Sequence, residues 1–286
     1  MKSWLILAGV LAACLLGSPA ALASTQTTES GGVTATFTYQ GHAPSYKGLR
    51  LSIARGGQVF YNAAVFSKWC RNRCWPALAK GPSVHVVDLE GNGQPDVVLD
   101  LYTGGAHCCT VEQIFSFDPG TMTYVKVERD FGDPGVAIDD LGHNGRYELL
   151  TADDLFAYEF TDFAASGLPI QIFSYSGGHF RDVTRSYPKL IAKDAALWLK
   201  AFRSMSKQGY QDSVGVIAAW AADEDLLGHS KLVSRYLTQQ AKAGHLKTPL
   251  SPQEPDGAKF VAKLQKFLLN HDYLRRAYAH AEPARR

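Results

Sequence analysis

Apolar and polar residues alternate along much of residues 33–184, which is the pattern of strands that bury one face. Three segments combine two alternating runs around a glycine or proline turn: LRLSIARGGQVFYNA, VEQIFSFDPGTMTYVKV and PIQIFSYSGGHFRDV. Such segments predict β-hairpins, because the turn residues accept the backbone angles that reverse the chain. The pattern therefore predicts an antiparallel, β-rich domain over residues 33–184.

The spacing of apolar residues becomes helical after Tyr187. Four of them fall on one helical face: Ile191, Ala195, Trp198 and Phe202. Further helices are predicted before Gly228, before Gly244 and along AKFVAKLQKFLLNHDYL. Residues 185–286 are therefore predicted to form an α-helical domain, and the fold class is predicted to be α+β.

Parts of the β-rich region recur at a spacing of about 50 residues, a period typical of blade-like sheets. Four residues of one loop match four of a second: Asp88, Asn92, Gly93 and Asp96 against Asp140, Asn144, Gly145 and Glu148. The hairpin segments QIFSF and QIFSY also resemble each other. Two copies and a fraction are too few to close the usual propeller ring, so we expect propeller-blade-like sheets in an open β-structure with a covered edge.

The first of these loops, DLEGNGQPD, carries the candidate chemistry. Calcium takes six to eight oxygen ligands, and a tight loop supplies them when alternate residues point inward. Five residues have that spacing: Asp88, Glu90, Asn92, Gln94 through its backbone carbonyl, and Asp96. Three carboxylates this close repel one another without a cation. The loop predicts a structural Ca²⁺ site, and a metal-free turn closed by side-chain hydrogen bonds remains the alternative.

This loop, with HVV before it and VVLD after it, resembles the calcium-binding loop of FG-GAP/VCBS-type repeats, the β-propeller blades of integrin α-chains. The segments DLYTGGAHCC, FGDPG and TADDLFAYEFTDFAASGLPIQI resemble uncharacterised exported proteins, mainly of actinobacteria. The resemblance covers about residues 80–185 and implies a VCBS-like fold and calcium, but no reaction. Glu90 departs from the usual Asp, and Gly142 replaces the acid in the second copy, which is expected to keep the turn and lose the ion.

The N-terminus reads as an export signal. Residues 1–23 contain a Lys, an apolar run and Ala21-Leu22-Ala23, as in a signal peptide cleaved after Ala23. Residues 24–32 are polar and end in glycine, which predicts a flexible leader. A lipid anchor through Cys14 is the alternative processing. No segment is long and apolar enough to predict a membrane span, and the protein is expected to be secreted or held in the cell envelope.

Four cysteines follow the signal: Cys70, Cys74, Cys108 and Cys109. An even number in an exported chain predicts disulfides. A bond between adjacent cysteines needs a strained ring, so we expect Cys108 and Cys109 to bond the other two crosswise. A zinc site that joins these thiols to His107 or His85 is the alternative.

A net charge of +2 and a pI near 8.2 do not indicate a nucleic-acid-binding protein. No common hydrolase, nucleotide-binding or metalloprotease motif is found. We therefore expect an exported, calcium-stabilised binding or scaffold protein that contacts a protein or a glycan. The alternatives are a secreted hydrolase with an acidic cleft between the domains, using Asp153 or Asp154, and an adaptor whose basic helices bind an anionic polymer.

Overall fold

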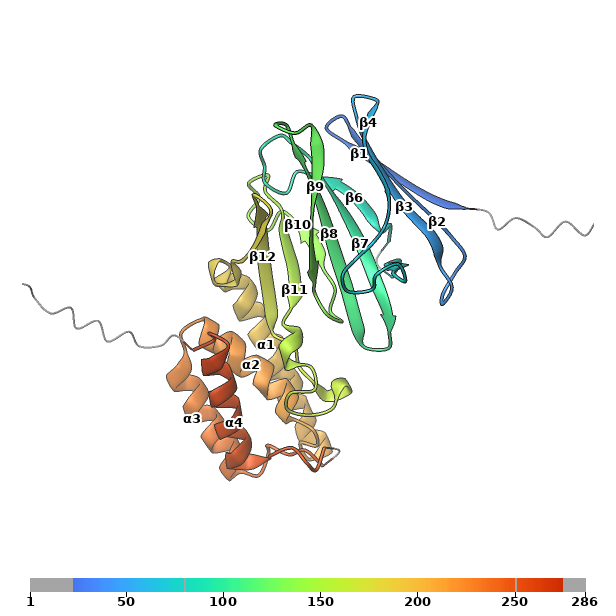
Figure 1. Cartoon of the computed structure of the whole chain (residues 1–286). Coiled ribbons are helices and arrows are strands. Elements are labelled where there is room, and N and C mark those ends of the chain that lie inside the picture. The colour runs from blue at the N-terminus through green and yellow to red at the C-terminus, as the bar shows by residue number, and fades with distance from the viewer. Residues whose placement is uncertain (1–22, 80, 250, 275–286) are drawn as a thin grey trace, which may run out of the picture.

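The computed structural model describes residues 23–79, 81–249 and 251–274. In this part of the chain, three antiparallel β-sheets are followed by four α-helices, so the predicted α+β class is confirmed (Figure 1). Residues 1–22 of the predicted signal peptide, Cys14 among them, lie outside the described residues. None of the described helices has the length and apolar character required to cross a bilayer.

The first sheet is a meander of four strands: β1 (Ser24–Ser30), β2 (Val33–Gln40), β3 (Lys47–Arg55) and β4 (Gln58–Ala64). The prediction of a flexible leader is wrong here, because residues 24–30 form strand β1 and pair with β2 from Ser24↔Tyr39 to Ser30↔Val33. Thr25, Thr27 and Thr28 favour extended backbone. The strand lies at the sheet edge and is mostly exposed, so it lacks an apolar alternation.

The middle sheet has β7 (Asp96–Gly105) and β8 (Cys108–Asp118) at its centre, with β9 (Thr123–Asp130) beside β8. The short strands β5 (Trp75–Pro76) and β6 (Val84–Val87) both pair with β7. The third sheet is a second meander of four strands: β10 (Ala137–Asp139), β11 (Glu148–Ala152), β12 (Ile170–Ser176) and β13 (His179–Asp182).

The central strands β7 and β8 of the middle sheet bury residues on both faces, and Figure 1 shows this sheet between the other two sheets. Successive side chains of a strand point to opposite faces. Val97 and Leu99 of β7 accordingly join the core shared with the first sheet, whereas Val98 joins the core shared with the third. This explains why β7 reads as a nearly continuous apolar run in the sequence.

Four helices complete the described chain: α1 (Pro188–Ser204), α2 (Val214–Leu226), α3 (Ser230–Lys242) and α4 (Gly257–Asn270). Short 3₁₀ helices lie at η1 (Asp154–Phe156), η2 (Phe163–Ala165), η3 (Thr184–Ser186) and η4 (Met205–Gln208). The predicted inward residues Ile191, Ala195 and Phe202 are buried. Phe156 and Phe160 also belong to the helical core, although they precede the expected boundary at residue 185.

The cysteines pair locally. Cys70 bonds Cys74, with Cα atoms 5.1 Å apart, and Cys108 bonds Cys109. The expected crosswise pairing is therefore wrong, because each pair already lies within one loop or strand. All four thiols are used in disulfides, which also removes the thiolate ligands that the zinc alternative needs.

Candidate functional site

The loop between β6 and β7 is closed by its own side chains. The Asp88 carboxylate accepts backbone hydrogen bonds from Asn92 at 3.1 Å and from Gly93 at 2.6 Å. The Asn92 side chain then accepts one from the amide of Gln94 at 2.8 Å. Gly93 has φ +80°, a conformation that glycine adopts without strain. The sequence thus forms the tight turn that alternate inward-pointing ligands require.

The second copy of the loop has the same hydrogen-bond network. Asp140 accepts from the amides of Asn144 and Gly145, both at 2.9 Å, and the Asn144 side chain accepts from the amide of Arg146 at 3.0 Å. The predicted turn of the second copy is therefore present. Its loss of the ion stays a prediction.

Asp96, at the start of β7, is the most deeply buried acid of the first loop, with 3% of its surface exposed. Its Oδ2 has no hydrogen-bond partner in the described part of the chain. Burial raises the pKa of Asp96 to about 6, and hydrogen bonds from Ser116 and from the amide of Leu89 oppose that rise. The charges of Glu90 and Asp88 raise the pKa further. A buried oxygen without a partner, next to two acids, is a place where a cation would be stabilised.

Glu90 has a different environment from the one expected of a ligand. Its Oε1 accepts a hydrogen bond from the amide of Gly177 at 2.9 Å, and its Oε2 accepts one from the Ser176 hydroxyl at 3.2 Å. Both residues lie at the turn between β12 and β13. Glu90 therefore joins the loop to the third sheet in this geometry.

The remaining oxygens fit a hard cation only in part. Four candidate ligands keep the spacing of calcium loops in other folds: Asp88, Asn92, the carbonyl of Gln94 and Asp96, at positions 1, 5, 7 and 9 of the loop. Gly93 stands at position 6, where such loops need a glycine. Across residues 23–79, 81–249 and 251–274, however, no three His, Cys, Asp or Glu side chains gather closely enough to hold a metal ion. The loop thus offers two carboxylates, an amide oxygen and a carbonyl, without the third acid that Glu90 was expected to add.

The loop contacts both neighbouring sheets. Arg55, at the end of β3, donates a hydrogen bond from Nη2 to the Gln94 side chain at 2.5 Å. On the other side, the amide of Tyr147 donates to the carbonyl of Leu89 at 3.3 Å, beside the Glu90 contact. A loop that leads into the middle sheet therefore holds the first and third sheets as well.

The two acids considered for hydrolysis, Asp153 and Asp154, have structural partners. Asp153 caps η1 through the amide of Leu155 and accepts a hydrogen bond from the Tyr273 hydroxyl at 2.7 Å. Asp154 packs on Gly132 and accepts a long hydrogen bond of 3.4 Å from the amide of Asp133. A cavity of about 610 Å³ is lined by Asp153, but Asp154 is not among its lining residues.

A polar cluster that the sequence reasoning missed lies on the middle sheet. His85 Nε2 is 3.0 Å from Asp100 Oδ2, and this hydrogen bond raises the pKa of His85. Glu112 faces Asp100 across β7 and β8, and these three residues line a cavity of about 370 Å³. The available signal was a charged residue inside an apolar run, Asp100 in VVLDLY and Glu112 in TVEQIF.

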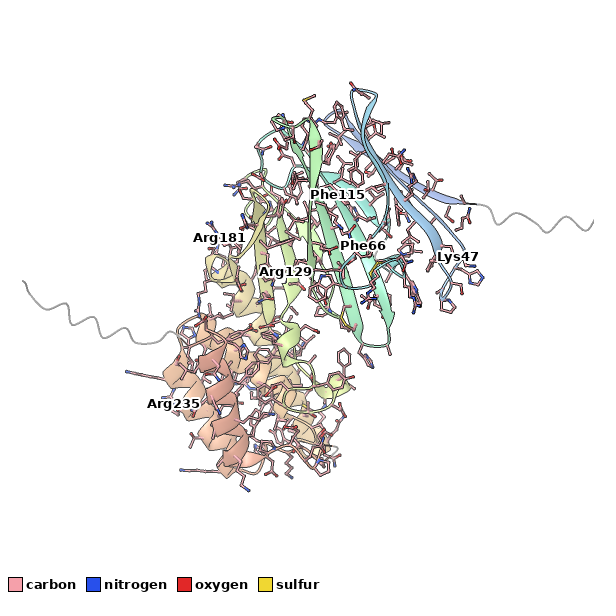
Figure 2. The ribbon with its side chains drawn as sticks, viewed as in Figure 1. Lys47, Phe66, Phe115, Arg129, Arg181 and Arg235 are labelled. Carbon is pink, nitrogen blue, oxygen red and sulfur yellow. A yellow bond between two sulfur atoms is a disulfide. The ribbon has the colours of Figure 1, made fainter. Side chains whose placement is uncertain are left out.

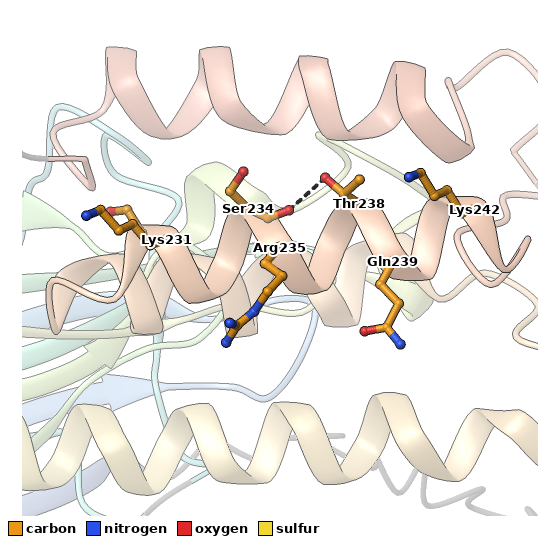
Figure 3. Close-up of a pocket in the computed structure, with 7 residues that line it drawn as sticks. Lys231, Ser234, Arg235, Thr238, Gln239 and Lys242 are labelled. Atoms are coloured by element: carbon orange, nitrogen blue, oxygen red, sulfur yellow. Dashed lines mark hydrogen bonds between the residues drawn. The ribbon is translucent and has the colours of Figure 1, made fainter.

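A surface groove on the helices is lined by residues of α3 (Figure 3). Lys231, Arg235 and Lys242 give it a basic character, and Thr238 donates a hydrogen bond to the carbonyl of Ser234 within the same helix. A groove made by one helix encloses no ligand, and this face has the composition of a solvated helix surface.

Two curated proteins are similar to this chain. One is the "Probable thylakoid lumen protein sll0997" of Synechocystis sp., 30% identical over 152 residues, which cover 51% of this chain and 44% of that protein. The other is the "Uncharacterized protein y4bJ" of Sinorhizobium fredii, 26% identical over 140 residues, which cover 48% of this chain and 22% of that protein. The chain thus spans less than half the length of either relative. No family model and no solved structure matches the chain.

Proposed function

We propose that this protein is an exported binding or scaffold protein whose sheets are held together by a calcium loop at residues 88–96. The observation that carries the proposal is the position of that loop. It contacts the first sheet through Arg55 and the third through Glu90, and it contains the buried, unpartnered oxygen of Asp96. An ion bound there would stabilise the arrangement of all three sheets.

The ligands in this proposal are Asp88, Asn92, the Gln94 carbonyl and Asp96, with waters completing the shell. Glu90 is not among these ligands, because its carboxylate accepts hydrogen bonds from Ser176 and Gly177. To reach the ion, Glu90 would have to break both contacts. An affinity of about 10⁻⁴ to 10⁻³ M is enough for a structural ion outside the cytoplasm.

An extracytoplasmic location is supported by the two disulfides and by the similarity to a protein named for the thylakoid lumen. Binding rather than catalysis is supported by the acids near the helices, since Asp153 is engaged as a cap and as the acceptor of Tyr273. The partner that follows from this proposal is a protein or a glycan of the envelope or the extracellular space.

Thermal unfolding with calcium and with a chelator tests the proposal. About 10 mM Ca²⁺ should stabilise the wild-type protein by roughly 1–3 kcal/mol. Asp88→Ala should abolish this response, whereas Asp140→Ala, which removes the equivalent acid of the second loop, should keep it. A panel of glycan and ester substrates tests the rival function. Turnover that Asp153→Asn abolishes without loss of the fold would replace the binding proposal with a hydrolase.

A further inference from the structure

Residues 66–74, which we call the disulfide loop, connect the first sheet to the middle sheet and are held by their own hydrogen bonds. Ser67 and Arg71 exchange two backbone hydrogen bonds of 3.0 and 2.6 Å, and the amide of Arg73 donates to the carbonyl of Cys70 at 2.9 Å. The Cys70–Cys74 disulfide closes the same segment. A loop fixed in this way loses little conformational entropy when it binds a partner.

Two large apolar side chains of this loop face solvent. Phe66 is 56% exposed and Trp69 is 49% exposed. Trp75, the first residue after the loop, behaves differently, because its ring packs 5.9 Å from that of Tyr102 and against Gly104. Trp75 thus supports the fold, whereas neither Phe66 nor Trp69 makes a ring–ring contact with the residues that the structure describes.

The same loop carries three exposed basic residues. Lys68, Arg71 and Arg73 are exposed on the loop, and the Lys68 ammonium lies 5.0 Å from the centre of the Trp69 ring. Lys126 also contacts the loop, since its Nζ donates to the carbonyl of Phe66 at 2.7 Å, but this ammonium is paired with Glu128 at 3.5 Å and adds no net charge. Glu128, an acid in contact with the loop, is only 11% exposed at its side chain and accepts the amide of Lys68.

We propose that the disulfide loop docks the protein on an anionic lipid surface, with Phe66 and Trp69 entering the headgroup layer and the basic residues binding lipid phosphates. Tryptophan and basic residues favour this interface, where an aromatic body meets the apolar region and cations meet anionic headgroups. The inference goes beyond the proposed function, and it does not depend on calcium.

A lipid surface fits the loop better than a carbohydrate does. Phe66 has no polar atom with which to bind sugar hydroxyls, and the exposed polar groups beside it are the cationic donors Lys68, Arg71 and Arg73. A loop that exposes two aromatic side chains and three cations gains from both burial and charge at an anionic membrane. An uncharged glycan has no anionic group to pair with the cations and no apolar region in which to bury Phe66.

Vesicle binding of the full chain tests the proposal. Vesicles of phosphatidylcholine with phosphatidylglycerol should bind the protein, and pure phosphatidylcholine vesicles should bind it far more weakly. The triple variant Lys68→Gln, Arg71→Gln and Arg73→Gln should weaken binding by about fivefold per charge removed, roughly 100-fold in all. The double variant Phe66→Ala and Trp69→Ala should weaken it by about tenfold.

A matched control removes the same charge from α3 through Lys231→Gln, Arg235→Gln and Lys242→Gln. Figure 2 places Phe66 among the sheets and Arg235 on the helices, so the control leaves the loop intact. This variant should lose less than about fivefold in affinity. Brominated lipids should quench the wild-type fluorescence, and Trp69→Phe should remove most of the quenching while the protein still binds.

Three results would overturn the proposal: no binding of the wild type to anionic vesicles, an equal loss in the α3 control, or quenching unchanged by Trp69→Phe. Binding to an anionic polysaccharide but not to vesicles would assign the loop to a carbohydrate instead. Unchanged melting of each variant shows that a loss of binding does not come from unfolding.

Discussion

Gly91 of the first loop lies directly against Gly145 of the second. A Cβ atom at position 91 would stand 2.9 Å from the Gly145 carbonyl oxygen and 2.8 Å from the Arg146 side chain. Gly91 also has φ +64°, which disfavours other residues. The two copies of the repeat therefore meet through their loops, and the close approach depends on the absence of a side chain at Gly91.

Gly91→Ala should destabilise the protein by about 3 kcal/mol, because it combines backbone strain with a contact on the neighbouring loop. Gly93→Ala is the matched control, since Gly93 has φ +80° but no atom within 4 Å of its would-be Cβ. The control should cost only about 1 kcal/mol. Urea unfolding measures both values, and equal losses would show that the contact between the loops does not matter.

Glu90→Ala should lower the free energy of unfolding by about 1 kcal/mol, because it removes two hydrogen bonds whose exposed donors, the Gly177 amide and the Ser176 hydroxyl, then turn to water. Glu29→Ala, on the exposed strand β1, should change stability by less than about 0.5 kcal/mol. The stabilisation by Ca²⁺ should persist in Glu90→Ala. If Glu90→Ala instead lost the stabilisation by Ca²⁺ while its stability without calcium stayed unchanged, Glu90 would be a ligand of the ion.

Asp96 should make stability depend on pH when calcium is absent. Its pKa is about 6 in the folded protein, above the ordinary 3.8, so the unfolded chain loses this proton first as pH rises. Stability should therefore fall by about 2 kcal/mol between pH 4 and pH 6 in chelator, and calcium should reduce the fall by binding the carboxylate. Asp96→Asn should flatten this part of the profile. An unchanged profile in Asp96→Asn would show that Asp96 does not titrate as described.

Asp223 is a second buried acid, in the helical core. Burial and the neighbouring Asp194 raise its pKa to about 10, while the Asp194 carboxylate accepts from Trp198 Nε1 at 2.9 Å. Between about pH 4 and pH 10, the folded protein therefore holds a proton on Asp223 that the unfolded chain has lost. The free energy of unfolding should decline over this range as pH rises. Asp223→Asn cannot ionise, so its melting temperature should exceed that of the wild type more at pH 8 than at pH 4. A difference that is the same at both pH values would contradict this.

The sequence predicted the elements whose burial follows a regular pattern. The alternation in β2 and the helical spacing of Ile191 and Phe202 both reflect one buried face, and the structure has these elements where expected. Strand β1 gave no such signal, because its polar side chains stay largely exposed and its pairing depends on β2. The turn of the loop was also predictable, since its hydrogen bonds join residues at most five positions apart.

Most contacts of the candidate site could not be predicted from the sequence, because they join residues that are far apart along the chain. Glu90 meets Ser176, which is 86 positions away, only because the third sheet packs beside the middle one. The cysteine pairing depends on the local course of the chain around Ser67 and Arg71, which spacing between cysteines does not specify. The His85–Asp100 pair likewise depends on the register of β6 and β7, which places His85 opposite Val98, two residues before Asp100.

Calorimetric titration with Ca²⁺ tests most directly whether residues 88–96 hold the ion. The wild type should bind one calcium with a dissociation constant of about 10⁻⁴ to 10⁻³ M. Asp96→Asn should abolish this binding, and Glu148→Gln, at the same position of the second loop, should leave it unchanged. Absence of calcium binding by the wild type, or equal binding by Asp96→Asn, would contradict the account.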